Sequence, residues 1–319
     1  MISKVFKFSL LLSLAILSFN ARSQEADSVK IRNEFDSLIN ISQAMINDRK
    51  FEEANKVLQQ IEQFVRMSLG SESVEYGIYI VQKGAVQLSM ADYKSAEESF
   101  WAAEKVIVKA AGKENVHYGS VAHHLGIIYN IKNDNKKAIE YLNIAYTLRD
   151  KYLGSNHRDC ANSLHSLAVV MSSMGNYEKA RELHEKCLQI WLNNYGEEHP
   201  NTIRALHNIG ITSIYLNEIS VAEPILLKAM ALRRKVLGEK HPDYAATLNS
   251  LGLLYIDKGD YINAETYLVK AKDIRALAYT KEHPIYLQSI NNIAGLYGHL
   301  GYYEKAKQYF FEAKEVASK

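Results

Sequence analysis

The sequence predicts an all-α solenoid, a fold in which one small helix hairpin is stacked many times. Three series of small residues recur every 42 positions along the chain. They are Ala54, Ala96, Ala138, Ala180, Ala222, Ala264 and Ala306; Gly84, Gly126, Ala168, Gly210, Gly252 and Ala294; and Gly70, Gly112, Gly154, Gly196 and Gly238. A fixed period of this length is typical of repeat architectures, whose units bury their apolar faces only against their neighbours. The seven alanines of the first series predict about seven hairpins.

The repeat at residues 241–282 shows how each hairpin is built. Its first half carries apolar or small residues at i, i+3, i+4 and i+7, the spacing of one helix face: Leu248, Leu251, Gly252 and Tyr255. A turn is expected at residues 259–260, and the same spacing then returns at Ala264, Tyr267, Leu268 and Ala271. Each unit is therefore predicted to be two antiparallel helices of roughly 14–18 residues. We expect Gly252 and Ala264 where the two helix axes cross most closely.

Recurring His–Pro pairs are expected to mark where each hairpin begins. Pairs at residues 199–200, 241–242 and 283–284 are 42 residues apart, and His157 is in phase with them. Proline suits the first turn of a helix, where its missing N–H costs no hydrogen bond. Histidines that recur in four loops are poor candidates for catalysis. Pro224 differs because it lies inside a predicted second helix, where it should bend that helix or mark its first turn.

Residues 1–23 have the order of a cleavable secretory signal. Two lysines precede an uncharged apolar run from Phe8 to Phe19, and small residues follow at Ala21 and Ser23. This run of about 12 residues is shorter than the roughly 20 that a membrane-spanning helix needs. We therefore expect an exported protein, periplasmic or extracellular, that begins at Gln24 and does not insert in the membrane. An uncleaved anchor is the alternative.

Charge gives no reason to expect nucleic acid as a partner. The full chain carries 38 basic and 36 acidic residues, and three of the basic ones lie in residues 1–23. Removing them leaves 35 basic and 36 acidic residues, a net charge of −1. A nearly neutral chain has no strong field to attract a polyanion.

The two cysteines, Cys160 and Cys187, lie in one repeat. Other repeats mostly carry alanine at the position of Cys187, so its simplest role is that of a small buried side chain. In an exported protein the two thiols could also form a disulfide, because a helix hairpin brings the two ends of its helices together. The distance between them decides, and both outcomes stay open.

These residues resemble the tetratricopeptide repeat, in the long form typical of kinesin light chains and many bacterial proteins. The stretch His241–Tyr255, followed by residues 259–261 and 264–265, is very similar to that family's unit. The resemblance is strong over residues 115–319 and weaker over residues 24–114, where Lys83 and Gln87 depart from later copies. It implies a right-handed superhelix of helix hairpins whose first helices line a concave face.

Polar residues on the first helices form the candidate binding column. They precede the packing leucine by one or two positions and are expected to point off the buried stripe: His123, His165, His207, Asn208, Asn249, Asn291 and Asn292. Apolar residues further along the same helices form an adjacent ridge: Ile127, Val169, Ile211 and Leu253. Amides that donate and accept, beside an apolar ridge, suit an extended peptide or protein segment.

The sequence offers little support for catalysis or for metal binding. Histidines equivalent by repeat should lie about 8–10 Å apart, too far to share a zinc ion. No glycine-rich phosphate loop and no nucleophile elbow is found. We therefore expect no metal, no cofactor and no enzymatic activity. The leading prediction is an extracytoplasmic binding scaffold, and the alternative is a regulatory arm of a larger signalling or CHAT-protease-like polypeptide.

The last predicted hairpin carries an apolar surface that bears on self-association. It carries Tyr309, Phe310, Phe311 and Val316 close to Lys319. In earlier units the next repeat covers this face. An uncovered apolar end often marks an interface. We therefore expect either pairing with a second copy through this hairpin or cover from a following segment.

Overall fold

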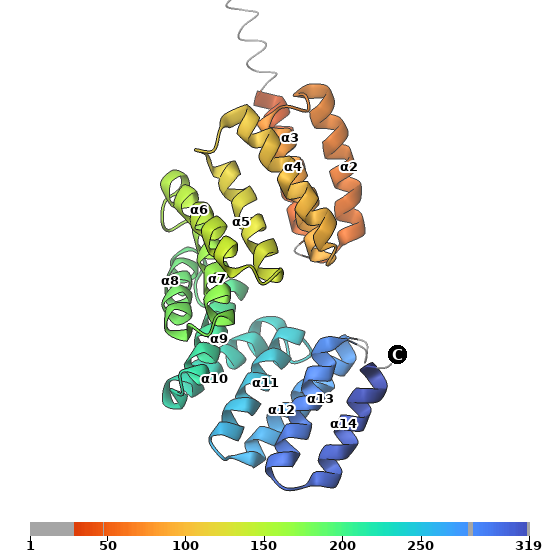
Figure 1. Ribbon diagram of the computed structural model, residues 1–319, viewed down its shortest axis with the longest axis vertical. Helices are drawn as coiled ribbons and strands as arrows, with labels where there is room; N and C mark the ends of the chain where they lie inside the picture. The colour runs from red at the N-terminus through yellow and green to blue at the C-terminus, as the bar shows by residue number, and fades with distance from the viewer. Residues whose placement is uncertain (1–28, 47, 280–282, 318–319) are drawn as a thin grey trace, which may run out of the picture. The chain divides into compact units, whose positions relative to one another are not determined.

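The computed structural model describes residues 29–46, 48–279 and 283–317, and every regular element in these ranges is a helix (Figure 1). A first helix covers residues 29–46. The others are α2 (Phe51–Ser68), α3 (Val74–Ser89), α4 (Tyr93–Ala111), α5 (Val116–Ile131), α6 (Asn135–Leu153), α7 (Arg158–Ser173), α8 (Tyr177–Tyr195), α9 (Pro200–Tyr215), α10 (Ile219–Leu237), α11 (Pro242–Asp257), α12 (Tyr261–Ala278), α13 (Pro284–His299) and α14 (Tyr303–Ala317). The all-α prediction is confirmed.

The chain divides into two compact units, Met1–Lys132 and Asn133–Lys319. The described helices of the first unit run up to α5, and the second unit holds α6 to α14. Within each unit, consecutive helices pack against one another. This division follows contacts, whereas the boundary expected near residue 114 follows sequence regularity and stays a prediction.

Helix lengths repeat along the chain as the period predicts. The first helices α3, α5, α7, α9, α11 and α13 have 16 residues each. The second helices α4, α6, α8 and α10 have 19 residues, slightly more than expected. In sequence order the helices form the seven pairs predicted from the alanine series.

Small residues lie where the two helices of a hairpin cross, as predicted. Ala264 is fully buried, and a Cβ built on Gly252 would lie 2.6 Å from Cγ of Leu268 and 3.3 Å from the Ala264 carbonyl oxygen. Gly210 meets Leu226 in the same way, at 2.6 Å. The helices can approach this closely only because no side chain separates them.

The recurring histidines are helix N-caps. The Nδ1 atoms of His157, His199, His241 and His283 accept a backbone N–H two residues further on, at 3.1, 3.3, 3.1 and 3.2 Å respectively. Asn115 and Ser73 make the corresponding cap in earlier repeats with their side-chain oxygens. A cap satisfies one of the free N–H groups at a helix start. The predicted structural role is confirmed, and catalysis is not needed to explain these residues.

Pro224 lies inside α10, beyond its first turn. Of the two outcomes expected for Pro224, the one that places it in the first turn is wrong, because α10 already begins at Ile219. The helix continues through the proline, although the ring removes the hydrogen bond that an N–H at this position would make.

The last hairpin ends with an apolar residue uncovered. Phe310 is 52% exposed, whereas Phe100 and Leu268, at the same position of earlier repeats, are fully buried. In the earlier repeats a following first helix covers this position: the Phe100 ring stacks on His124 with ring centroids 4.8 Å apart. Self-association through this hairpin stays a prediction. The side chain of Val316 lies outside the described residues.

The segment at residues 1–23, expected to be a secretory signal, also lies outside the described residues. Among the helices that the structure describes, none has the length and apolar character needed to cross a membrane.

Candidate functional site

The first helices of the second unit line a hollow of about 570 Å³. α11 contacts both α9 and α13 directly, so these three helices form one continuous surface. Six of the predicted residues are brought together there: His207, Ile211, Asn249, Leu253, Asn291 and Asn292. We call this hollow the α9–α11–α13 groove.

Polar side chains in and beside the groove bond from one repeat to the next, 43 residues apart. Asn292 donates its Nδ2 hydrogen to Oδ1 of Asn249 at 2.8 Å. Asn208 lies 3.5 Å from Nδ1 of His165 in the equivalent pair. The pair between them, His207 and Ser250, is not formed, because the Ser250 hydroxyl donates instead to the Ala246 carbonyl oxygen. One position of this polar column, at His207, therefore lacks the hydrogen bond between repeats.

The expectation that the column side chains point away from the buried surface is wrong for three of them. His207 is 7% exposed, Asn249 is 6% exposed, and His123 in the other compact unit is 8% exposed. They are covered because neighbouring first helices approach one another closely. Asn291, by contrast, is exposed, and Asn292 is partly exposed.

His207 is a buried imidazole with an unsatisfied nitrogen. Its Nδ1 has no hydrogen-bond partner. Burial, together with the Arg233 and Arg275 guanidinium groups, lowers the pKa of His207 to about 3. The ring is therefore neutral near pH 7 and can donate through one nitrogen and accept through the other.

Arg275 brings a positive charge to the groove from α12. Its Nη1 donates to the Ser289 hydroxyl at 2.8 Å and to the Ile285 carbonyl oxygen at 3.3 Å, both on α13. Burial lowers the pKa of this guanidinium, and its Nε has no partner. The charge lies at the end of the groove where α11 and α13 begin. Asp257 and His299 lie at the opposite end.

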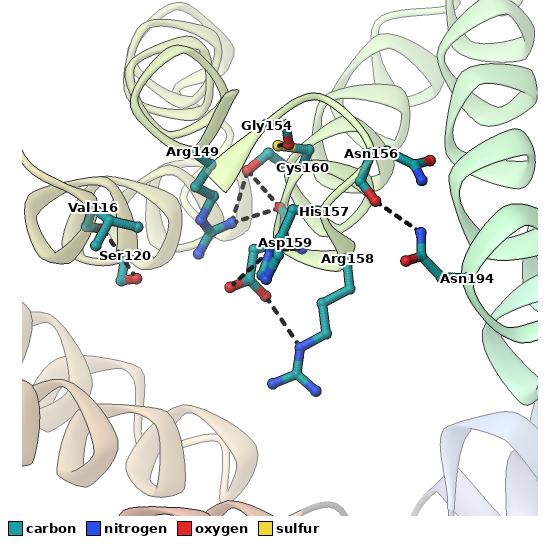
Figure 2. Close-up of polar contacts among 11 residues, drawn as sticks. Val116, Ser120, Arg149, Gly154, Asn156, His157, Arg158, Asp159, Cys160 and Asn194 are labelled. Atoms are coloured by element: carbon teal, nitrogen blue, oxygen red, sulfur yellow. Dashed lines mark hydrogen bonds and ion pairs between the residues drawn. The ribbon is translucent and has the colours of Figure 1, made fainter. Parts of the chain in front are cut away.

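The same arginine junction recurs between other repeats, and the sequence analysis missed it. Arg149 donates to the Asp159 carbonyl oxygen, as Figure 2 shows at the start of α7. It also donates to the Ser163 hydroxyl at 2.7 Å. Arg233 donates to the Asp243 carbonyl oxygen and to Thr247, each at 2.7 Å. The available signal was arginine at the repeat spacing with a hydroxyl residue 14 positions later. At the α8–α9 junction both partners change together, to Trp191 and Ala205.

The remaining predicted column residues are not part of this groove. His165 and Asn208 form their own pair beside it. His123 is buried on α5, in the other compact unit, where its ring lies 5.4 Å from that of His124. The structure therefore supports a local site in the second unit.

Cys160 and Cys187 are both free thiols and both buried. Cys160 directs its Sγ to the Gly154 carbonyl oxygen at 3.4 Å, a contact visible in Figure 2. Burial raises the pKa of each thiol to about 11, which keeps both protonated and unreactive. Across the described ranges, no group of three or more His, Cys, Asp or Glu side chains is placed to hold a metal ion.

Comparison with protein-family models identifies the repeat family. A family model described as tetratricopeptide repeat matches residues 118–187, 167–235 and 243–319, which together cover more than half of the chain. A search of curated proteins finds no match.

Several solved structures have a similar fold. BtubC (BKLC) from P. vanneervenii is 19% identical, with a TM-score of 0.59 over 74% of this chain and 93% of that chain. Repeats of a putative kinesin light chain from Podosopora anserina are 25% identical, with a TM-score of 0.51 over 61% of this chain and 92% of that one. NprR in complex with its cognate peptide NprX is 14% identical, with a TM-score of 0.67 over 90% of this chain and 79% of that one. The expected resemblance to repeats of the kinesin-light-chain type is confirmed.

Proposed function

Because the chain belongs to the tetratricopeptide repeat family, we propose that it is a non-enzymatic scaffold that binds an extended protein segment in the α9–α11–α13 groove. The observation that carries this proposal is the accessible Asn291 amide in the groove. It lies beside an apolar ridge in which Leu253 is 37% exposed. Such a site offers hydrogen bonds to a peptide backbone and a surface for its apolar side chains.

The size of the groove sets the length of the ligand. Packed helices lie about 8–10 Å apart, so a segment that crosses α9, α11 and α13 spans about 16–20 Å. An extended chain rises about 3.3 Å per residue, which gives a segment of about five or six residues. Asn291 and Asn292 are accessible for backbone hydrogen bonds. A neutral His207 keeps its hydrogen-bonding character across the physiological pH range.

A comparison supports a ligand of this kind without identifying it. NprR, which has a similar fold, was solved with a cognate peptide. The ligand proposed for this chain is inferred from its own groove. The groove holds the Arg275 guanidinium at one end and the Asp257 carboxylate at the other.

The test is a selection of short random displayed peptides on the purified chain, followed by fluorescence anisotropy with the enriched peptide. Leu253→Glu should weaken its binding at least about tenfold, a loss of about 1.4 kcal/mol. Val169→Glu is the matched control, because Val169 occupies the same repeat position on α7 and is 38% exposed. Equal losses of affinity in both variants, or no loss in Leu253→Glu, would show that the peptide does not bind in the groove.

We also propose that this binding takes place outside the cytoplasm. The support is the basic start, the apolar run from Phe8 to Phe19 and the small residues Ala21 and Ser23. Mass spectrometry of the protein from fractionated cells should find an N-terminus at Gln24 in the exported fraction. An intact Met1 terminus in the cytoplasm would contradict it. The alternative of a regulatory arm stays a prediction, tested by reading the gene beyond the Lys319 codon.

A further inference from the structure

The outer face of α12 carries two strongly exposed apolar side chains. Ile262 is 82% exposed and Leu277 is 81% exposed. The positions equivalent to Ile262 hold polar or charged residues in all other repeats: Glu52, Lys94, Lys136, Glu178, Ser220 and Glu304. The positions equivalent to Leu277 hold Lys109, Lys151, Asn193 and Lys235, with Met67 the exception. Repeat stacking therefore does not require apolar residues here.

In other repeats the residue at the position of Leu277 makes a polar contact with the neighbouring repeat. Lys235 donates to Glu198, and Asn193 donates to Asn156 at 3.3 Å. The repeat position of Glu198 and Asn156 is occupied by Lys240 in this repeat, and a leucine side chain forms no polar contact with a lysine. α12 has thus lost a polar contact of the array and presents an apolar side chain to solvent instead. An exposed apolar residue that makes no contact within the array indicates a role in an interface and not in stabilising the fold.

The two leucine-sized side chains belong to a stripe along one helix face. Ile262, Thr266, Val269, Asp273 and Leu277 follow one another at intervals of four, three, four and four residues, and they line a hollow of about 600 Å³. Helical residues at such spacings lie on one face. The order is apolar, polar, apolar, polar, apolar, and it is unchanged when the helix is reversed. We call these five residues the α12 stripe.

We propose that the α12 stripe is a docking surface for a second copy of this chain, with the two α12 helices antiparallel about a two-fold axis. A two-fold interface places the same patch on both subunits and therefore needs a self-complementary pattern. Reversal brings Ile262 against the partner's Leu277, and Val269 to the centre. It also brings the Thr266 hydroxyl to the carboxylate of the partner's Asp273. To donate to that carboxylate, the hydroxyl exchanges its present bond to the Ile262 carbonyl oxygen, at 2.9 Å, for the bond across the interface.

The neighbouring charged side chains do not cover the α12 stripe. Lys270 lies at its edge, but its Nζ is held away by Glu239 at 3.0 Å and by the Tyr244 hydroxyl at 3.4 Å. Asp273 pairs with its neighbour Lys272, at 3.1 Å, and its side chain is largely exposed. The carboxylate is therefore accessible to a donor from a second copy.

The expected affinity follows from the size of the surface. Stable interfaces bury about 1,200–2,000 Å² in total, more than one face of an 18-residue helix supplies. Apolar residues at the position of Val269 in the flanking helices, Leu227 on α10 and Phe311 on α14, extend it. We therefore expect a concentration-dependent dimer. The peptide groove lies on the first helices, so both grooves stay open and a dimer gains avidity for a bivalent partner.

Sedimentation equilibrium of the purified chain over a range of concentrations tests the proposal. Wild type should associate to a dimer, and Ile262→Lys with Leu277→Lys, which restores the residue type of other repeats, should be monomeric. Met67→Lys is the matched control and should leave association unchanged, because Met67 is equally exposed at the same position of α2. A monomeric wild type, or a dimer lost in Phe310→Glu but kept in the double lysine variant, would overturn the proposal.

A cysteine experiment tests the antiparallel register. Ile262→Cys and Leu277→Cys are prepared separately, mixed and oxidised, and the two native cysteines are buried and stay out of the reaction. The expected product is the crossed disulfide between the two variants, because only that pair lies within bonding distance across the two-fold axis. Rapid formation of a disulfide between two copies of Ile262→Cys alone would show a parallel arrangement and contradict the proposal.

Discussion

Replacing Gly252 by alanine tests whether close helix crossing stabilises the array. A Cβ at this position would lie 2.6 and 2.7 Å from Cγ and Cδ2 of Leu268. Leu268 is fully buried, and the Ala264 carbonyl oxygen is 3.3 Å away on the same side, so neither can move aside cheaply. Overpacking of this kind costs about 1–3 kcal/mol. Alanine regains up to about 1 kcal/mol from its higher helix propensity.

The control is Gly295→Ala on α13, where no heavy atom lies within 4 Å of the added Cβ. That variant should gain about 0.5–1 kcal/mol, because only helix propensity changes. The free energies of unfolding of the two variants, measured by urea denaturation, should therefore differ by about 1–3 kcal/mol. Leu268→Ala in the Gly252→Ala background should cost less than it does in wild type, because the clash is gone. Equal and stabilising shifts in both glycine variants would refute the close-crossing argument.

Three further predictions concern the polar interior of the second unit. Asn249→Ala should lower the free energy of unfolding by about 1 kcal/mol, because it leaves the Asn292 amide without its acceptor. His207→Leu should be nearly neutral, since it removes an unsatisfied nitrogen. Urea melts that rank the two variants in the opposite order would contradict this. Arg233→Trp should destabilise by about 1–3 kcal/mol, and adding Thr247→Ala should recover part of the loss by reproducing the α8–α9 junction; a double variant that is less stable than the single one would count against it. Burial lowers the folded-state pKa of His165 and His207 to about 3 and of His184 to about 4, below the unfolded value near 6.5, so the unfolded chain binds more protons below pH 6.5. Stability should therefore be complete above pH 6.5 and fall by at least about 2 kcal/mol by pH 5, and a urea midpoint that does not change over this interval would contradict the burial of these rings.

The repeat fold could be predicted because its causes are local in sequence. The 42-residue period, the helix-face spacing of Leu248 to Tyr255 and the small residues at the crossings each specify a hairpin without knowledge of distant contacts. The histidine caps were located correctly as helix starts. Their capping bond was not foreseen, because the role of Nδ1 depends on backbone geometry.

The details of the site depend on contacts between repeats, which a single repeat does not reveal. Asn249 appears polar and accessible on its own helix, but α13 covers it and supplies Asn292 as a partner. Arg275 suggests a solvated charge, yet the start of α13 provides two neutral acceptors and buries it. The wrong expectation for Asn249 and the failure to single out Arg275 have one cause, the closeness of neighbouring helices.

The most direct test of the central claim is a photo-crosslinking measurement with the selected peptide. A photoreactive amino acid is placed at Leu253 in the α9–α11–α13 groove, at Val169 on α7 and at Ile262 on the outer face of α12. We expect peptide adducts at position 253 and none at positions 169 and 262. Adducts at position 262, or equal labelling at all three positions, would show that the groove does not hold the ligand.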